Sequence, residues 1–259
     1  MNDKAKKRLP LGRFSLRSFI VLVVVAAIWF AWLSNRAQQQ RKAVLWIESV
    51  GGTALYDYQV DEEGNRNGNS RSNWPGLLVN ALGQDYFSSV IYVDLNETPV
   101  ESLEQTRSLR KLRTLRIAKT KITHVGTVSQ FQNLRYLDVS NTSVSDLSAV
   151  SALRNLTRIE ASKTRVADLA PLRECSKLEV ISLSNTQVQD LAPLEGMTGL
   201  RQLSLDQTAI ESLSPLRRLE NLEFLLIWNT GVSKSEADTF RVANPTCRVV
   251  HSFKLHRKK

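Results

Sequence analysis

The chain has 259 residues, 42% of them hydrophobic, and a formal net charge of +10. The charge lies mainly at the two ends: residues 1–33 hold six Lys or Arg against one acid, and residues 254–259 add four basic residues. The body between them carries 25 basic and 24 acidic side chains, which argues against a nucleic-acid-binding domain, so we expect no nucleic-acid partner.

An apolar segment follows a short basic segment at residues 1–13. Phe19–Leu33 is uninterrupted but has only 15 residues, and extension to residues 14–33 gives the roughly 20 residues that cross a bilayer core. The extension includes Arg17, whose long side chain can reach the headgroups, while Trp29 and Trp32 are typical of the opposite membrane interface. We therefore predict that residues 14–33 form a transmembrane helix in contact with the lipid bilayer.

Two alternatives to a retained span are a cleaved signal peptide and a peripheral or buried helix. Residues 31–36 read AWLSNR and offer no good cleavage site, which favours an uncleaved anchor. Six basic residues precede the apolar run Phe19–Leu33 and three follow it closely, and this bias predicts a cytoplasmic N-terminus. The expected location is the cell membrane, with a single span and with the repeats on the extracytoplasmic (periplasmic) side.

Residues 34–89 are expected to form a juxtamembrane helix and an N-terminal cap. The helix continues from the span to about Val50 and ends at Gly51-Gly52. A strand is predicted over 53–60 and a mobile Asn- and Gly-rich loop over 61–72. A short helix then runs from Trp74-Pro75 to near Gly83.

A 22-residue repeat fills residues 90–232. It is marked by one threonine per unit: Thr98, Thr120, Thr142, Thr164, Thr186, Thr208 and Thr230. Aligned on these threonines, the positions eight, five and three residues before and two residues after are apolar in every unit. The unit reads L-x-x-L-x-L-x-x-T-x-V-x-D-L-x-P-L. One such unit cannot bury its apolar face alone, so the seven units must stack into a solenoid.

This unit resembles the leucine-rich repeat in its 22-residue internalin-like form. The resemblance implies an α/β fold, a solenoid with a curved parallel β-sheet and with turns and short helical segments on the convex side. Threonine replaces the family's usual Asn or Cys, and we expect these hydroxyls to satisfy buried backbone groups as a structural threonine ladder. Asp146, Asp168 and Asp190 are predicted to cap the helical segments. Residues 233–259 are predicted to form a C-terminal cap, with a helix over 233–243 and a strand over 247–251, and a basic tail.

A second resemblance concerns the flanks. The stretch Arg13–Tyr58, with its span, residues 36–44 (RAQQQRKAV) and the pattern G-G-x-x-x-Y-D-Y, is similar to a bacterial family abundant in planctomycetes. The closing residues 244–249, NPTCRV, resemble the C-terminal cap of that family. This resemblance implies a single-span membrane protein with leucine-rich repeats, and it implies no particular activity.

No pattern in the sequence indicates catalysis. His124 occupies an aspartate column on the outer side of the solenoid, His251 and His256 lie in the C-terminal cap and tail, and no hydrolase, kinase or metal motif is present. Cys175 falls in an apolar column, and three repeats separate it from Cys247, too far for a disulfide. We therefore expect a non-enzymatic protein without a cofactor or a bound metal.

The candidate ligand-binding surface is the concave sheet face, where strand residues alternate with the core columns. The candidate residues are Tyr92, Asp94, Arg116, Tyr136, Asp138, Arg158, Glu160, Phe224, Leu226 and Trp228. The last three, here called the C-terminal patch, are interpreted either as a contact site or as a surface covered by the C-terminal cap. A basic cluster between Arg107 and Lys121 is either a solvated surface or an anion or polysaccharide site.

The function predicted from these features is a membrane-anchored leucine-rich-repeat module that binds a protein or a glycan through its concave sheet outside the cytoplasm. The alternative is a structural envelope scaffold without a discrete ligand.

Overall fold

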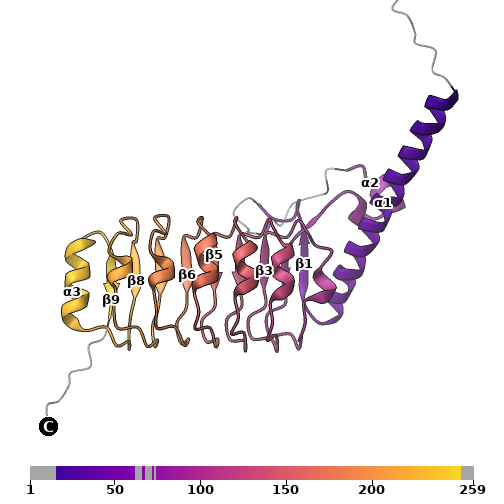
Figure 1. Cartoon of the computed structure of the whole chain (residues 1–259). Helices are drawn as coiled ribbons and strands as arrows, with labels where there is room; N and C mark the ends of the chain where they lie inside the picture. Colours follow the sequence, from indigo (N-terminus) through magenta and orange to yellow (C-terminus); the bar gives the residue numbers. More distant parts are fainter. Residues whose placement is uncertain (1–15, 62–65, 68–71, 73, 252–259) are drawn as a thin grey trace, which may run out of the picture.

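The chain forms one long helix that leads into a row of stacked repeats (Figure 1). The structure, a computed structural model, describes residues 16–61, 66, 67, 72 and 74–251. The predicted basic segment 1–13, most of the predicted mobile loop 61–72 and the tail 252–259 lie outside the described residues.

The described residues contain a nine-stranded sheet whose strands follow one another in chain order. β1 (Thr53–Tyr56) is antiparallel to β2 (Val90–Asp94), and every later pair is parallel. The later strands are β3 (Thr114–Arg116), β4 (Tyr136–Asp138), β5 (Arg158–Glu160), β6 (Val180–Ser182), β7 (Gln202–Ser204), β8 (Phe224–Leu226) and β9 (Arg248–Val250). The register pairs equivalent residues of successive units, so each repeat column forms a row across the sheet.

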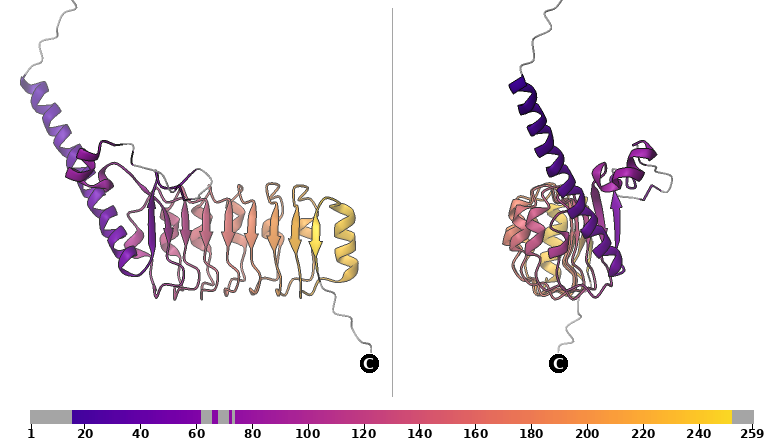
Figure 2. Two further views of the ribbon diagram at one scale, coloured as in Figure 1. Left: turned by 180° about the vertical axis from the view of Figure 1, so that it is seen from behind. Right: turned by 90° about the vertical axis from the view of Figure 1, so that its right-hand side faces the viewer.

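Single turns of 3-10 helix line the opposite face of the solenoid. They are η2 (Glu104–Thr106), η3 (Gly126–Gln130), η4 (Ser148–Ala152), η5 (Ala170–Glu174), η6 (Ala192–Leu194) and η7 (Ser214–Leu216). The aspartates predicted to cap these turns lie one residue before the leucine at the N-cap position. The carboxylates of Asp146, Asp168 and Asp190 accept the N–H of the first residue of their turns at 2.7–2.8 Å. The row of strands curves only slightly in Figure 2. Neighbouring α-helices pack with their axes about 8–10 Å apart, which is wider than the spacing between neighbouring strands. A 3-10 turn is narrower than an α-helix, so the spacing between units is similar on the two faces and the sheet stays nearly flat.

The core lies between these two faces and runs the length of the solenoid. The apolar columns of the repeat are buried in every unit and form one continuous cluster. Phe131 and Cys175 fill the column contributed by the 3-10 side, and both are fully buried. Because the cluster is continuous, each unit is stabilised by its neighbours.

The threonine column satisfies backbone groups within its own unit. In all seven units the Thr hydroxyl donates to the carbonyl three residues earlier, at 2.6–3.0 Å, as from Thr186 to Leu183. The residue before each of these threonines has a positive φ of 55–61°, the left-handed conformation that turns the chain after the strand. Each hydroxyl thus satisfies a backbone carbonyl of its own unit, and these bonds do not connect one unit to the next.

Asparagine side chains provide connections between units. Asn133, Asn155 and Asn221 each donate to a backbone carbonyl 23 residues earlier, at 2.8–3.1 Å. All three directly precede the first leucine of their unit, and their role between units was not predicted from the sequence. Asn96 acts similarly on the sheet side, accepting the backbone N–H of Ala118 at 2.7 Å.

Replacing Thr186 by valine tests the threonine column. Valine keeps the shape of the side chain but leaves the buried carbonyl of Leu183 without its hydroxyl donor, so we expect a loss of about 1.5 kcal/mol in the free energy of unfolding. Urea unfolding followed by circular dichroism measures the loss. The control is Thr198→Val at an exposed position, which should leave the free energy of unfolding unchanged. If Thr186→Val has the same free energy of unfolding as the wild type and the control, the threonine column has no structural role.

The N-terminal cap is built by α1 (Leu16–Ser49), a single uninterrupted helix of 34 residues. Its C-terminal half buries Ala43, Val44 and Ile47 against the first repeat, and Ala37 is also buried. Gln40 is also buried, donating to Asp85 Oδ1 at 3.0 Å and to the carbonyl of Ser88 at 2.8 Å, while its Oε1 accepts the N–H of Val90 at 3.2 Å. One helix therefore contains both the predicted span and the cover of the solenoid.

Two further elements complete the caps. α2 (Gly76–Leu82) and the 3-10 turn η1 (Gln84–Tyr86) lie between β1 and β2 in the chain, and β1 is shorter than the predicted strand 53–60 because the chain turns after Tyr56. At the other end, α3 (Lys234–Ala243) is capped by Ser233 and buries Ala237 and Phe240 on the last repeat. β9 then extends the sheet beside β8, as predicted for the closing strand.

Candidate functional site

The sheet face consists of two rows that cross the strands in register. The first row begins with Tyr92, Thr114, Tyr136 and Arg158 and ends with Gln202 and Phe224. The second row begins with Asp94, Arg116, Asp138 and Glu160, continues through the small Ser182 and Ser204, and ends at Leu226. The register thus separates the predicted residues into two groups: the C-terminal patch and an N-terminal polar group that consists of Tyr92, Asp94, Arg116, Tyr136, Asp138, Arg158 and Glu160.

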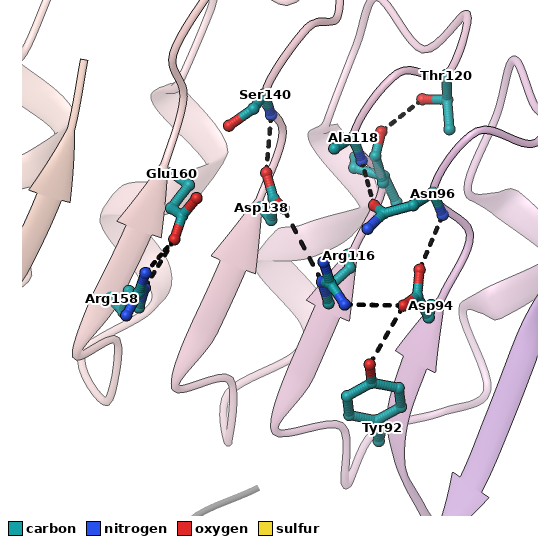
Figure 3. A network of polar contacts seen from close by, with 11 residues as sticks. Tyr92, Asp94, Asn96, Arg116, Ala118, Thr120, Asp138, Ser140, Arg158 and Glu160 are labelled. Carbon is teal, nitrogen blue, oxygen red and sulfur yellow. Dashed lines mark hydrogen bonds and ion pairs between the residues drawn. The ribbon is translucent and has the colours of Figure 1, made fainter. Parts of the chain in front are cut away.

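Arg116 is the centre of the N-terminal polar group (Figure 3). Its Nη1 donates to Asp94 Oδ2 at 3.0 Å, and its Nε lies 4.0 Å from Asp138 Oδ2 on the other side. Asp94 also accepts the Tyr92 hydroxyl at 3.2 Å and the N–H of Asn96 at 3.0 Å. One guanidinium is therefore held between two carboxylates on neighbouring strands, so the surface is ordered before any partner binds.

Arg158 extends this group by one unit. Its Nε donates to Glu160 Oε1 at 2.8 Å, its Nη2 forms an ion pair with the same oxygen, and its guanidinium carbon lies 5.3 Å from the centre of the Tyr136 ring. Burial, helped by the charges of Asp138 and Glu160, raises the pKa of Tyr136 to about 12. The phenol therefore stays neutral at physiological pH and can donate a hydrogen bond to a ligand.

A groove of about 800 Å³ runs beside this polar group at the edge where the strands begin. Tyr92, Arg116, Tyr136 and Arg158 line it from the sheet. Val60 and Asp61, which follow β1, bound it on another side. Three further basic side chains line the groove: Arg113, Arg135 and Lys177. Arg113 belongs to the basic cluster noted between Arg107 and Lys121, but its grouping with Arg135 and Lys177 was not predicted from the sequence, although a basic residue recurs at the equivalent positions 113 and 135 of two successive units.

The C-terminal patch is open to solvent. Phe224 is 40% exposed, Trp228 is 46% exposed and Leu226 between them is half-buried. The interpretation that the C-terminal cap covers these side chains is therefore wrong for the described residues. α3 packs on the end of the core and β9 pairs along the edge of β8, so neither lies over the sheet face (Figure 2).

Replacing Asp138 by asparagine tests the electrostatics of this face. Burial raises the pKa of the Asp138 carboxyl, against the opposing effects of hydrogen bonds from Ser140 and of Arg116. Because its pKa is higher in the folded state than in the unfolded chain, the carboxyl of Asp138 binds its proton more tightly when the protein is folded. Ionisation of Asp138 therefore lowers the free energy of unfolding once the pH is above the pKa values of this carboxyl in both states. Asparagine keeps an oxygen for the N–H of Ser140, so we expect Asp138→Asn to melt at a higher temperature than the wild type at pH 7 and at the same temperature below about pH 3.

The contrasting variant is Asp94→Asn, which loses the charge facing Arg116 at 3.0 Å and should melt at a lower temperature than the wild type at pH 7. Thermal melts at both pH values decide the matter. A lower melting temperature of Asp138→Asn at pH 7 would mean that the distant Arg116 outweighs the cost of burial.

The remaining candidates for chemistry lie in the core or at the surface. Cys175 and Cys247 are free and buried, and desolvation raises the pKa of both thiols to about 11, so neither is a ready nucleophile. His124 is exposed and contacts the hydroxyl of Thr123. Among the described residues, no group of three or more His, Cys, Asp and Glu side chains could hold a metal ion.

A stack of 22-residue units, each with one short strand and one helical turn around a shared leucine core, defines a leucine-rich-repeat solenoid. The chain belongs to the leucine-rich-repeat family: the family model described as a leucine-rich repeat region matches residues 87–257. Domains of this fold are in general modules for protein interaction. A search of curated proteins gave no match.

Three solved structures are similar to this chain. Internalin C2 of Listeria monocytogenes shares 20% identity over 68% of this chain and 89% of its own, with a TM-score of 0.55. A leucine-rich-repeat protein of Leptospira interrogans shares 21% identity over 59% of this chain and 40% of its own, also with a TM-score of 0.55. The internalin InlF of Listeria monocytogenes shares 21% identity, covers 61% of this chain and 56% of its own, and has a TM-score of 0.50. These similarities establish the fold, and the planctomycete-type resemblance of the N-terminal flank stays an expectation.

Proposed function

We propose that this protein is a membrane-anchored leucine-rich-repeat module that binds a protein or a glycan through its sheet face. In this proposal α1 crosses the cell membrane once, the N-terminus lies in the cytoplasm and the repeats lie on the periplasmic side. The observation that carries the proposal is the ordered polar group around Arg116 and Arg158, which holds aromatic and charged side chains in fixed positions on an open face.

The exposure of α1 supports the anchor. Its first half is apolar and long enough to cross a bilayer, and residues 16–32 are exposed along their whole length. A helix that is hydrophobic on all sides and packs against nothing else in the described structure is unfavourable in water. A bilayer accounts for this surface, and the basic residues before the span favour a cytoplasmic N-terminus.

Binding energy in interfaces concentrates in aromatic and arginine side chains. The sheet face offers such side chains at its two ends, Tyr136 and Arg158 near the N-terminus and Trp228 near the C-terminus. The middle carries Ser182 and Ser204, which have little area to desolvate. We therefore assign recognition to the two ends.

The test measures the affinity of a partner recovered by proximity labelling from native cells. We expect Arg158→Ala or Trp228→Ala to weaken binding about 30-fold, the size of a typical interface hot spot. Ser182→Ala is the matched control on the same face and should bind like the wild type. An affinity that survives the loss of Tyr136, Arg158 and Trp228 together would reject recognition by this face.

The topology is tested separately. A reporter enzyme that is active only outside the cytoplasm should be active when fused after residue 259, and the mature protein should keep residues 14–33. Activity of a cytoplasm-specific reporter at the same position would reverse the orientation, and a mature N-terminus after Leu33 would show that the segment is a cleaved signal.

A further inference from the structure

α2 exposes an apolar surface on the N-terminal cap. None of its seven residues is buried, and Leu77 is 81% exposed, while Leu78, Leu82 and the preceding Trp74 are also exposed. Residues 74–82 contain no charged side chain. Such a concentration of apolar area on one short element is unfavourable in water and indicates a contact with another apolar phase.

Contacts with α1 fix the position of this surface. The hydroxyl of Tyr86, in the turn η1 that follows α2, lies 2.7 Å from the hydroxyl of Ser34, the first residue after the predicted span. Gly83, directly after α2, lies beside Arg41, because a Cβ on this glycine would be 3.9 Å from the Arg41 guanidinium. Ser34 and Arg41 are about 10 Å apart along a helix, so α2 is connected to α1 just beyond the end of the span. Figures 1 and 2 show α2 at the level of the middle of α1.

Basic side chains lie at the same level. The nine residues that follow the span, 34–42, include Arg36, Arg41 and Lys42. Arg36 also donates to Ser89 Oγ at 2.9 Å. A recess of about 590 Å³ between α1 and the first repeat is lined by Trp32, Arg36, Arg110 and Lys111, among others. An aromatic side chain next to three cations is the composition that suits the headgroup region of a phospholipid leaflet.

We propose that α2 is a second membrane contact, an interfacial helix whose leucines and Trp74 enter the headgroup–acyl boundary of the leaflet from which α1 emerges. This inference rests on the proposed anchoring of α1. A single span leaves the solenoid free to rotate about the axis of the helix. A second contact with the same bilayer removes that freedom, so the sheet face takes one fixed orientation relative to the membrane. The depth of about 5–10 Å at which interfacial helices bury their apolar side is compatible with the position of α2 next to Ser34.

The experiment places an environment-sensitive fluorophore on single introduced cysteines of the full chain in nanodiscs of phosphatidylethanolamine and phosphatidylglycerol. Leu77→Cys reports α2, and Val242→Cys on α3 is the matched control, because the two side chains are 81% and 84% exposed. Ile28→Cys reports the span itself. The native thiols of Cys175 and Cys247 are buried, so the unsubstituted chain provides the labelling background.

We expect the probe at Leu77 to shift to shorter emission wavelengths and to be quenched by lipids that carry a nitroxide near the glycerol backbone, several-fold more than the probe at Val242. A quenched probe at Ile28 with a solvent-exposed probe at Leu77 would overturn the role of α2 while leaving the anchor intact. An unquenched probe at Ile28 would overturn the anchor itself. A shifted but unquenched probe at Leu77, and likewise at Leu82→Cys, would mean that protein rather than lipid covers α2, which also rejects the proposal.

Discussion

Replacing Leu178 by alanine is expected to lower the free energy of unfolding by about 2–5 kcal/mol. Leu178 is 1% exposed and belongs to the continuous core, at the first leucine column of its unit. Truncation to alanine loses the favourable transfer free energy of the buried side-chain atoms and leaves a cavity in the core. The cavity cannot collapse easily, because the repeat units on both sides hold the leucine column at a fixed spacing. Urea unfolding of the full chain in nanodiscs, followed by circular dichroism, measures the loss.

The matched control is Val242→Ala, which truncates an apolar side chain that is 84% exposed. We expect this variant to unfold within about 0.5 kcal/mol of the wild type. Similar losses for both variants would mean that the core column does not carry the stability assigned to it.

Replacing Gly52 by alanine is expected to cost about 3 kcal/mol. A Cβ at this position would lie 2.9 Å from the backbone oxygen of Asp94, 2.7 Å from Leu95 Cδ2 and 2.9 Å from Ile47 Cγ2. The first of these is backbone in β2 and cannot rotate away. The substitution therefore pushes α1 and β1 away from the first repeat, where the cap covers the core. Gly52 was predicted only as a helix terminator, and its close contacts explain why glycine is required there.

Gly126→Ala is the control for this substitution. A Cβ on Gly126, at the start of η3, would meet no atom within 4 Å. The same chemical change should therefore be nearly neutral, and calorimetric melting of the two variants separates the steric effect from the loss of chain flexibility. Equal destabilisation by both substitutions would contradict the close packing of α1 on the first repeat.

The repeat units could be predicted in detail because they depend on short-range periodicity. Threonines 22 residues apart identify every strand, every core column and the faces on which side chains lie. Residues such as Tyr136 and Arg158 were therefore placed on the sheet face, because a strand residue directly next to a buried one in the same strand points to the opposite side. The end of α1 at Ser49, just before the predicted terminator Gly51-Gly52, and α3 within the predicted helix 233–243 follow from equally local signals.

Features that depend on packing between elements could not be predicted in this way. Whether Trp228 is open or covered is decided by where α3 packs, and no periodicity contains that information. The groove lined by Arg113 and Arg135 forms because the segment after β1 returns to the sheet, a contact distant in sequence. The bonds from Asn133 and Asn155 to the preceding units repeat with the 22-residue period, so the recurrence of asparagine at this position was a signal for them in the sequence.

The central claim, that the sheet face is the surface of recognition, is tested most directly by site-specific photocrosslinking in native cells, with the crosslinking residue placed on both faces of the solenoid. Thr114 and Gln202 lie on the sheet face beside the two proposed ends, whereas Ser148 and Arg173 lie in η4 and η5 on the opposite face. We predict discrete protein or glycan adducts from Thr114 or Gln202 and none from Ser148 or Arg173. Adducts only from the η4 and η5 positions, or no adduct from any of the four, would contradict the claim.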